Sequence, residues 1–363
     1  MRRAHLRALR RSGYASPSMR FRTYKNTDLT VSEVGSGMWT VSTGWWGKYT
    51  EGEALALMHK AFDFGITLFD AADTYGNGLS EEYIAKAFPK NRDEIVIATK
   101  VGYDFVAHGE ARGRGQREIP QDFTPEAIGR ATDAALKRLK TDRIDLLQLH
   151  NIRMEQVEDD SLWKTLERLK EAGKIRYYGI ALGPAIGWLY EGVNAIRARE
   201  ITSIQHIYNL LEQHPGRAIH ETAREAGRDT MFLIRVPHSS GMLEGKYTPE
   251  TVFPAGDHRA HRPRTWLLNG VRKIKQLRFL ETPDRTLAQA ALQWLLADER
   301  TASTLPNVYN EEQLIEFARA PEAAALTSEE MERIAQLYIE NFGIEEDPPK
   351  FKGTMELAET VAV

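Results

Sequence analysis

The sequence predicts an α/β protein, a single (β/α)8 TIM barrel with an N-terminal β-hairpin and long loops after the third and seventh strands. Its 363 residues suit one large barrel with extensions as well as two ordinary domains. Short apolar runs rich in β-branched residues recur eight times and alternate with segments of helical periodicity. The first of them, in VGSGMWTVSTGWWG, has glycines but no GxGxxG pattern, which disfavours a doubly wound sheet.

The predicted strands are the eight apolar runs, which is the strand count of this barrel. They are Ser32–Trp39, Ile66–Ala72, Glu94–Lys100, Arg143–His150, Ile175–Leu182, Ser203–Leu211, Thr230–Pro237 and Thr301–Pro306.

The predicted helices show apolar residues three and four positions apart. One stripe runs from Ala54 to Phe62 and stops before Gly65, a residue suited to the left-handed position after a helix. Thr124 and Pro125 supply the N-cap and first turn of another. Further helices are expected at Leu162–Ala172, Ala185–Arg199, Arg217–Ala226 and Leu287–Leu296, with a last one after the capping box of Thr327 and Glu330.

Three stretches fall outside the repeat. Residues 20–31, with turn residues at 26–28, predict a hairpin that closes the bottom of the barrel. Residues 102–123 and 241–273 lack helical periodicity and are expected to be long functional loops. The predicted organisation is a basic extension at 1–18 that is disordered or precedes the true start at Met19, a barrel at 19–340, and a C-terminal tail at 341–363. A short transit peptide is the alternative for 1–18.

Composition narrows the possible partners. The net charge is −3, and because residues 1–18 hold five arginines and no acid, the remainder carries −8, which argues against nucleic acid. The absence of cysteine excludes disulfides and thiolate catalysis. No apolar run approaches the roughly 18 residues of a membrane span. We therefore expect neither a nucleic-acid nor a membrane partner, and a chain without cysteine fits the cytoplasm; its oligomeric state stays open.

Polar residues gather at the ends of three consecutive predicted strands. Asp70 and Tyr75 follow the second, Lys100 ends the third and His150 ends the fourth. The carboxyl ends of barrel strands carry the active site, so these side chains should meet at one rim. Each alone has a structural explanation, such as a cap, packing or surface charge, but their joint placement favours catalysis.

This quartet suits proton donation to a carbonyl oxygen. A neighbouring ammonium favours the phenolate form of a phenol, so Lys100 could make Tyr75 a usable acid. Asp70 would keep the lysine charged and oriented, and His150 would hydrogen-bond the reacting oxygen.

The motifs around these residues resemble the aldo-keto reductase family, in the branch of the potassium-channel β-subunits and related bacterial reductases. The likeness covers residues 19–337 and rests on FDAADTYGNGLSEE, IVIATKVG, IDLLQLH, AGKIRYYGI and SGMLEGKY. It implies a nicotinamide cofactor, NADPH or NADH, bound without a Rossmann motif, and a catalytic tetrad of Asp70, Tyr75, Lys100 and His150. Asp73 falls outside the tetrad and is expected to make a structural loop hydrogen bond.

The resemblance also implies the cofactor contacts, with departures from the usual pattern. Where the family usually has Val-Ser-Asn, this chain has Ile180, Ala181 and Leu182, so the nicotinamide carboxamide keeps Gln205 but loses two polar partners. Residues 307–317 hold no lysine or arginine for a 2′-phosphate, which leaves NADPH and NADH both open. The implied cofactor-binding residues are Trp39, Asp70, Gln205, Arg235, Pro237, His238, Ser239, Lys246, Arg259, Gln313 and Glu316.

The implied substrate is an aldehyde or ketone, and aromatics at the mouth could wall a pocket for a sugar or aryl carbonyl. The expected substrate residues are Trp39, Trp45, Trp46, Tyr75 and His150. No metal is expected, because His258 and His261 in DHRAHRPRTW have no further ligand in view. Two rival functions remain: a cofactor-sensing regulatory protein, and a lyase in which Lys100 forms a Schiff base.

Overall fold

A computed structural model describes residues 18–104, 108, 119–183 and 187–345. Its centre is a parallel sheet of eight strands in consecutive order from β3 to β10. The first and last strands meet where Val34 bridges Thr304 and the Gly35 amide donates to the Thr304 carbonyl at 2.8 Å, which closes the barrel. The predicted fold is confirmed. The strands are β3 (Ser36–Gly37), β4 (Leu68–Asp70), β5 (Val96–Val101), β6 (Ile144–His150), β7 (Ile175–Ala181), β8 (Ser203–Ile207), β9 (Met231–Arg235) and β10 (Thr301–Leu305).

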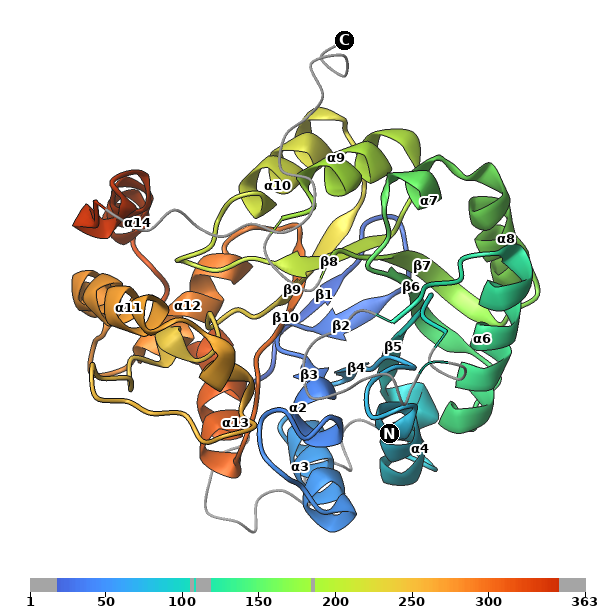
Figure 1. The fold of residues 1–363 in the computed structure, drawn as a ribbon, viewed down its shortest axis with the longest axis horizontal. Coiled ribbons are helices and arrows are strands. Elements are labelled where there is room, and N and C mark those ends of the chain that lie inside the picture. The colour runs from blue at the N-terminus through green and yellow to red at the C-terminus, as the bar shows by residue number, and fades with distance from the viewer. Residues whose placement is uncertain (1–17, 105–107, 109–118, 184–186, 346–363) are drawn as a thin grey trace.

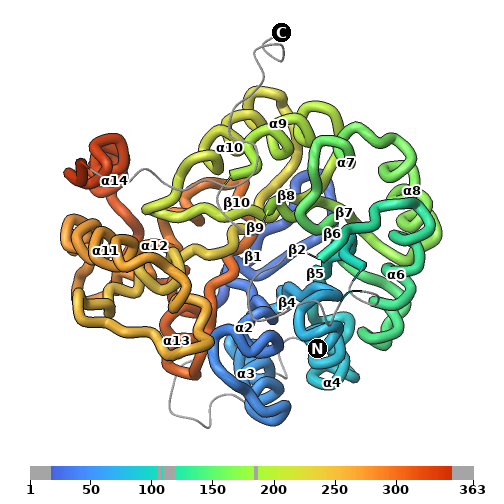
Figure 2. The backbone as a smooth tube through the Cα atoms, in the orientation of Figure 1, coloured from blue at the N-terminus to red at the C-terminus, as the bar shows by residue number. Residues whose placement is uncertain are grey.

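Helices surround the strands, as Figures 1 and 2 show from one end of the barrel. Side-chain caps fix several of their starts, including the Thr124 cap before Pro125 and the Thr327–Glu330 capping box that the sequence predicts. The helices are α2 (Trp39–Ser42), α3 (Glu51–Asp63), α4 (Leu79–Ala87), α6 (Pro125–Leu139), α7 (Met154–Glu158), α8 (Asp160–Glu171), α9 (Leu189–Ala198), α10 (Gly216–Glu225), α11 (Arg264–Leu277), α12 (Leu287–Leu296), α13 (Glu311–Ala318) and α14 (Ser328–Ile339).

The barrel interior has two chemically different layers. Alternate residues of a strand point to the same side, so the residues of one face recur every second position. An apolar layer near the strand starts includes Leu68, Ala98, Leu146 and Leu233. Two positions further along β4, β5 and β6, the same alternation gives Asp70, Lys100 and Gln148, all buried. The strands therefore carry a polar layer toward their carboxyl ends.

The hairpin β1 (Phe21–Thr23) and β2 (Thr30–Ser32) closes the opposite end of the barrel, as predicted. Tyr24, Leu29 and Val31 pack against the apolar layer, and the Tyr24 hydroxyl hydrogen-bonds Ser203 at the start of β8. This packing covers the bottom, so the carboxyl end is the open face.

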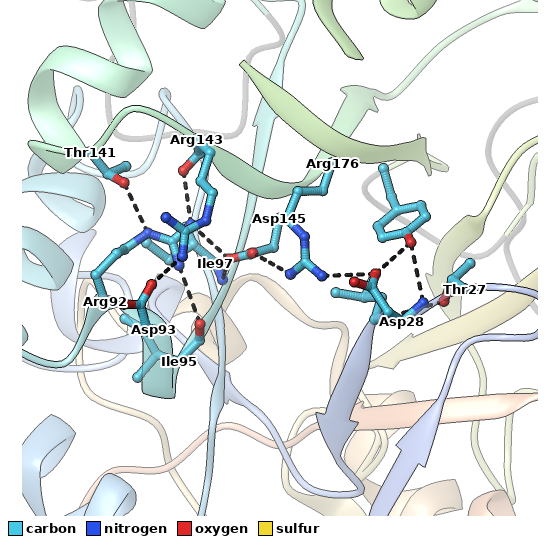
Figure 3. A network of polar contacts seen from close by, with 12 residues as sticks. Thr27, Asp28, Arg92, Asp93, Ile95, Ile97, Thr141, Arg143, Asp145 and Arg176 are labelled. Atoms are coloured by element: carbon cyan, nitrogen blue, oxygen red, sulfur yellow. Dashed lines mark hydrogen bonds and ion pairs between the residues drawn. The ribbon is translucent and has the colours of Figure 1, made fainter. Parts of the chain in front are cut away.

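A polar network fastens this closed end (Figure 3). The Asp145 carboxylate, which is 1% exposed, lies 2.8 Å from both Arg92 and Arg176 and accepts from the Ile97 amide. Arg176 also pairs with Asp28 of the hairpin turn. The network thus links the hairpin to β5, β6 and β7, far from the open face.

One expectation about the loops was wrong. Residues 241–273 contain the 3₁₀ turns η4 (Met242–Glu244) and η5 (His258–His261), and α11 begins at Arg264. The three- and four-residue spacing of Leu267, Val271 and Ile274 makes this helix, which packs on α12 and α14 in a second apolar cluster. Polar residues between these positions made the helical spacing hard to recognise in the sequence. Helices α4 and α13 were also not predicted.

Other expectations fall wholly or mostly outside the described residues. These are the extension at 1–17, most of the loop at 102–123, and the tail from 346 onward. Within the described chain, no helix is both long and apolar enough to cross a bilayer.

Candidate active site

Asp70 and Lys100 form a buried ion pair inside the mouth of the barrel. Asp70 ends β4, and Lys100 lies near the end of β5 with 0% of its surface exposed. The lysine Nζ donates to Asp70 Oδ2 at 2.7 Å and to the Ala71 carbonyl at 2.8 Å. A buried ammonium needs such partners, and here they fix its position.

Tyr75 lies beside this pair, in the loop between β4 and α4. The Lys100 Nζ is 4.8 Å from the centre of the phenol ring, and the Trp39 ring meets it edge-on at 4.9 Å. Tyr75 is buried, so its environment is set by the protein rather than by water.

The Ser-Glu end of the motif holds this loop. The Ser80 hydroxyl donates to the Ala72 carbonyl at 2.9 Å. The buried Glu81 accepts from Thr99 on β5 and from Arg138 on α6, each at 2.6 Å. Burial raises the pKa of Glu81, and Arg138 opposes that shift. The Asp73 amide donates to the Lys100 carbonyl at 3.2 Å, which ties the backbone of this loop to β5. The loop role expected of the Asp73 side chain stays a prediction.

His150 completes the quartet at the end of β6. Its ring is buried and lies 6.1 Å from the Tyr75 ring, centre to centre. Tyr103 packs edge-on against it at 5.1 Å, and Gln121 donates to its carbonyl at 2.9 Å. The structure therefore brings all four predicted catalytic residues together.

Two glutamines lie behind the ion pair. Gln205 on β8 and Gln148 on β6 donate to Asp70 Oδ1, at 2.8 and 3.2 Å. Gln205 was expected only as a carboxamide partner, and Gln148 was missed. Its signal is available in the sequence, because a polar residue two positions before His150 lies on the same face of its strand.

Arg235 ends β9 at the same rim. Its guanidinium donates to the carbonyls of Leu182 and Gly183, beyond the end of β7, and burial lowers its pKa. In this position it adjoins Ala181 and Leu182, which replace the family's polar pair.

The segment after β9 has an unusual backbone. Val236, Ser239 and Ser240 all have φ between +46° and +57°. This region is costly for a β-branched residue, and such strain concentrates at ligand sites. His238 in this turn is buried, and its Nε2–H donates to the Ala288 carbonyl at 3.0 Å. Burial lowers the pKa of His238 to about 4.

The chain from Met242 to Arg262, here called the strap, reaches across the mouth. The His258 amide donates to the Trp45 carbonyl at 2.9 Å, and the His258 ring stacks on Trp46. Arg259 pairs with Asp257 at 2.6 Å and lies 4.8 Å from the centre of the Trp46 ring. The strap thus joins the loop after β9 to the loop after β3.

The predicted adenosine-end residues also meet. Gln313 donates to Glu244 at 2.8 Å, and Lys246 lies 3.9 Å from Glu316 and 4.0 Å from Glu244. Lys246 is 63% exposed, and burial raises the pKa of Glu244. Two carboxylates surround one exposed ammonium.

The three predicted tryptophans take different positions. Trp39 stacks on Trp45 at 6.5 Å and faces Tyr75. Trp46 is buried between the strap and Tyr309. Trp39 is the nearest of them to the quartet.

Comparison with known proteins identifies the family. The sequence pattern of the Aldo/keto reductase family matches residues 33–339. The chain belongs to this family. It is therefore an NAD(P)H-dependent aldo/keto reductase, an oxidoreductase acting on carbonyl compounds.

Three relatives show how far the likeness extends. The uncharacterised oxidoreductase YqkF of Bacillus subtilis is 29% identical over 87% of this chain and 95% of its own length. The aldo-keto reductase yakc [NADP(+)] of Schizosaccharomyces pombe is 30% identical over 76% of this chain and 79% of its own. The holo form of aldo-keto reductase AKR11C1 from Bacillus halodurans superposes with a TM-score of 0.70, at 29% identity, over 88% of this chain and 96% of that one. The potassium-channel branch stays a prediction.

Proposed function

We propose that this aldo/keto reductase reduces an aldehyde or ketone to an alcohol with Tyr75 as proton donor. The observation that carries the proposal is the position of the Lys100 ammonium, held between Asp70 and the Ala71 carbonyl beside the Tyr75 ring. A fixed positive charge there stabilises the phenolate that remains after the proton leaves. His150, whose ring lies 6.1 Å from that of Tyr75, would donate to the substrate oxygen.

The mouth offers partners for a nicotinamide cofactor, which supplies the hydride when bound. Among the described residues, Arg235 Nε, His238 Nδ1 and Tyr309 Oη are buried polar atoms with no hydrogen-bond partner. Buried polar groups rarely stay unpaired, so these atoms suit a polar ligand along the rim. Gln205 would face the carboxamide with its amide oxygen, because its nitrogen donates to Asp70.

We further propose that the enzyme does not select NADPH over NADH. The carboxylates of Glu244 and Glu316 lie at the expected adenosine end, and Lys246 between them is already paired. A 2′-phosphate would meet like charge there. The name of the yeast relative carries NADP(+), so the two proteins would differ in this respect.

The geometry disfavours the Schiff-base alternative. Such a lysine must react as a free amine, whereas Lys100 is fully buried and paired with a carboxylate. Borohydride trapping of a carbonyl substrate would separate the two. The reductase should give no trapped adduct and should oxidise NADH or NADPH in the presence of an aldehyde.

A further inference from the structure

The Asp70 carboxylate is held from both sides. The Lys100 ammonium donates to Oδ2, while the side-chain amides of Gln205 and Gln148 donate to Oδ1 at 2.8 and 3.2 Å. Gln148 is 0% exposed, and its amide oxygen lies 3.3 Å from the Gln205 nitrogen. A buried layer of four polar side chains therefore spans the barrel beneath the mouth.

Burying the Gln148 amide costs free energy. An interior amide gives up its hydrogen bonds to water, and the layer below Gln148, which includes Leu146, is apolar and offers it no partner. The hydrogen bond to a charged acceptor is the interaction that offsets this cost, since such bonds are stronger than neutral ones. Gln148 thus acts on the quartet through Asp70.

The hydrogen bond also restricts the rotation of the carboxylate. Asp70 could turn about its terminal torsion, which is broad for this residue type. With Oδ1 held by two amides, Oδ2 stays on Lys100. The ammonium then keeps its position beside Tyr75.

We propose that Gln148 is a positioning residue for the reduction: it fixes the Asp70 carboxylate and, through it, the Lys100 ammonium. The inference rests on the proposed function, because it requires the quartet to be the catalytic site.

The first test is Gln148→Leu, measured with NADH and an aldehyde. We expect kcat to fall roughly tenfold, the loss for one hydrogen bond to a charged group. The KM for aldehyde and the Kd for NADH should stay within about twofold, because Gln205, the carboxamide partner that also contacts Gln148, keeps its 2.8 Å hydrogen bond to Asp70. The acidic limb of the kcat profile should move to higher pH, since a lost donor disfavours an ionised carboxylate.

A double-mutant cycle separates positioning from general structure. In an Asp70→Asn background, Gln148→Leu should cause little further loss of kcat, because its effect passes through Asp70. Gln293→Leu is the matched control: Gln293 on α12 is also buried and donates to the carbonyls of Ala320 and Ala323. It should lower stability and leave kcat and the pH profile unchanged.

The outcomes are distinguishable. If Tyr75→Phe retains turnover, the proposed function fails. If Tyr75→Phe is inactive while Gln148→Leu keeps the wild-type kcat and pH profile, or its loss adds fully to that of Asp70→Asn, only the positioning role is overturned. Gln148→Met serves if the leucine variant does not fold; failure of both to fold would make the role structural and overturn the proposal.

Discussion

Tyr75→Phe tests the proposed reaction most directly. It removes one hydroxyl and keeps the ring that packs 4.9 Å from Trp39 and 4.8 Å from Lys100 Nζ. Loss of a general acid typically costs 10² to 10⁴ in rate, which is about 3 to 5 kcal/mol of activation free energy. We expect kcat to fall by about that factor.

The assay needs binding and turnover from the same preparation. Quenching or shift of NADH and NADPH fluorescence gives the cofactor Kd, which should change less than about twofold because the ring is retained. Turnover is followed on a panel of aldehydes. Tyr24→Phe is the matched control, since it removes a buried hydroxyl at the closed end, where Tyr24 bonds Ser203.

The Tyr24→Phe control shows whether loss of a buried tyrosine hydroxyl is by itself enough to lower turnover. Tyr24→Phe should lose about 1 kcal/mol of stability and keep its turnover. A Tyr75→Phe enzyme that binds cofactor and still turns over at more than about a tenth of the wild-type rate would refute the role of the phenol. Failure of both cofactors to bind at millimolar concentration would refute the reductase mechanism as a whole.

Three further predictions concern stability and cofactor choice. Asp145→Ala should lower the free energy of unfolding by about 3 kcal/mol in urea denaturation, because it leaves two arginines at the closed end without their buried partner; Asp28→Ala, at an exposed pair, should cost less than about 1 kcal/mol. The free energy of unfolding should fall as the pH drops below about 6.5, because burial lowers the pKa values of His206 and His238, the latter to about 4. Between pH 6.5 and 4 the unfolded chain therefore binds protons that the folded chain does not, and for His238 the loss of unfolding free energy reaches about 2 kcal/mol by pH 5. NADH should bind at least as tightly as NADPH, and Glu316→Gln should tighten NADPH selectively by up to about fivefold in a fluorescence titration.

Each has a result that would contradict it. Equal losses for the two aspartate variants would mean that burial of Asp145 does not determine its contribution. Denaturation midpoints that do not change between pH 7.5 and 5, or a His238→Gln variant with the wild-type pH dependence, would remove the histidine argument. A strong NADPH preference that survives Glu316→Gln would show that another group reads the 2′-phosphate.

The quartet was predictable because its residues stand at strand ends. Asp70, Lys100 and His150 close apolar runs, and the barrel brings the ends of adjacent strands to one rim whatever the loops do. Arg259 is different. Its contacts with Trp46 and Asp257 depend on how the strap crosses the mouth, and no periodicity in the sequence specifies that path. Helix α11 was missed for a related reason, since arginine and lysine residues are interspersed among its apolar positions.

Gln148 was not predicted, but the sequence contains the information needed to find it. Once His150 is placed inside the mouth, the two-residue repeat of a strand puts Gln148 on the same face and one layer deeper. A polar side chain in that layer must find a partner, and β5 and β4 offer Lys100 and Asp70. The rule that finds a catalytic residue at a strand end therefore also finds the residue that supports it, two positions earlier. Gln148 pairs in register with Lys100, and one step further back the three strands carry Leu68, Ala98 and Leu146, all apolar, so the polar layer ends at the same depth on β6 as on β5, and only its upper edge, at His150, lies closer to the mouth.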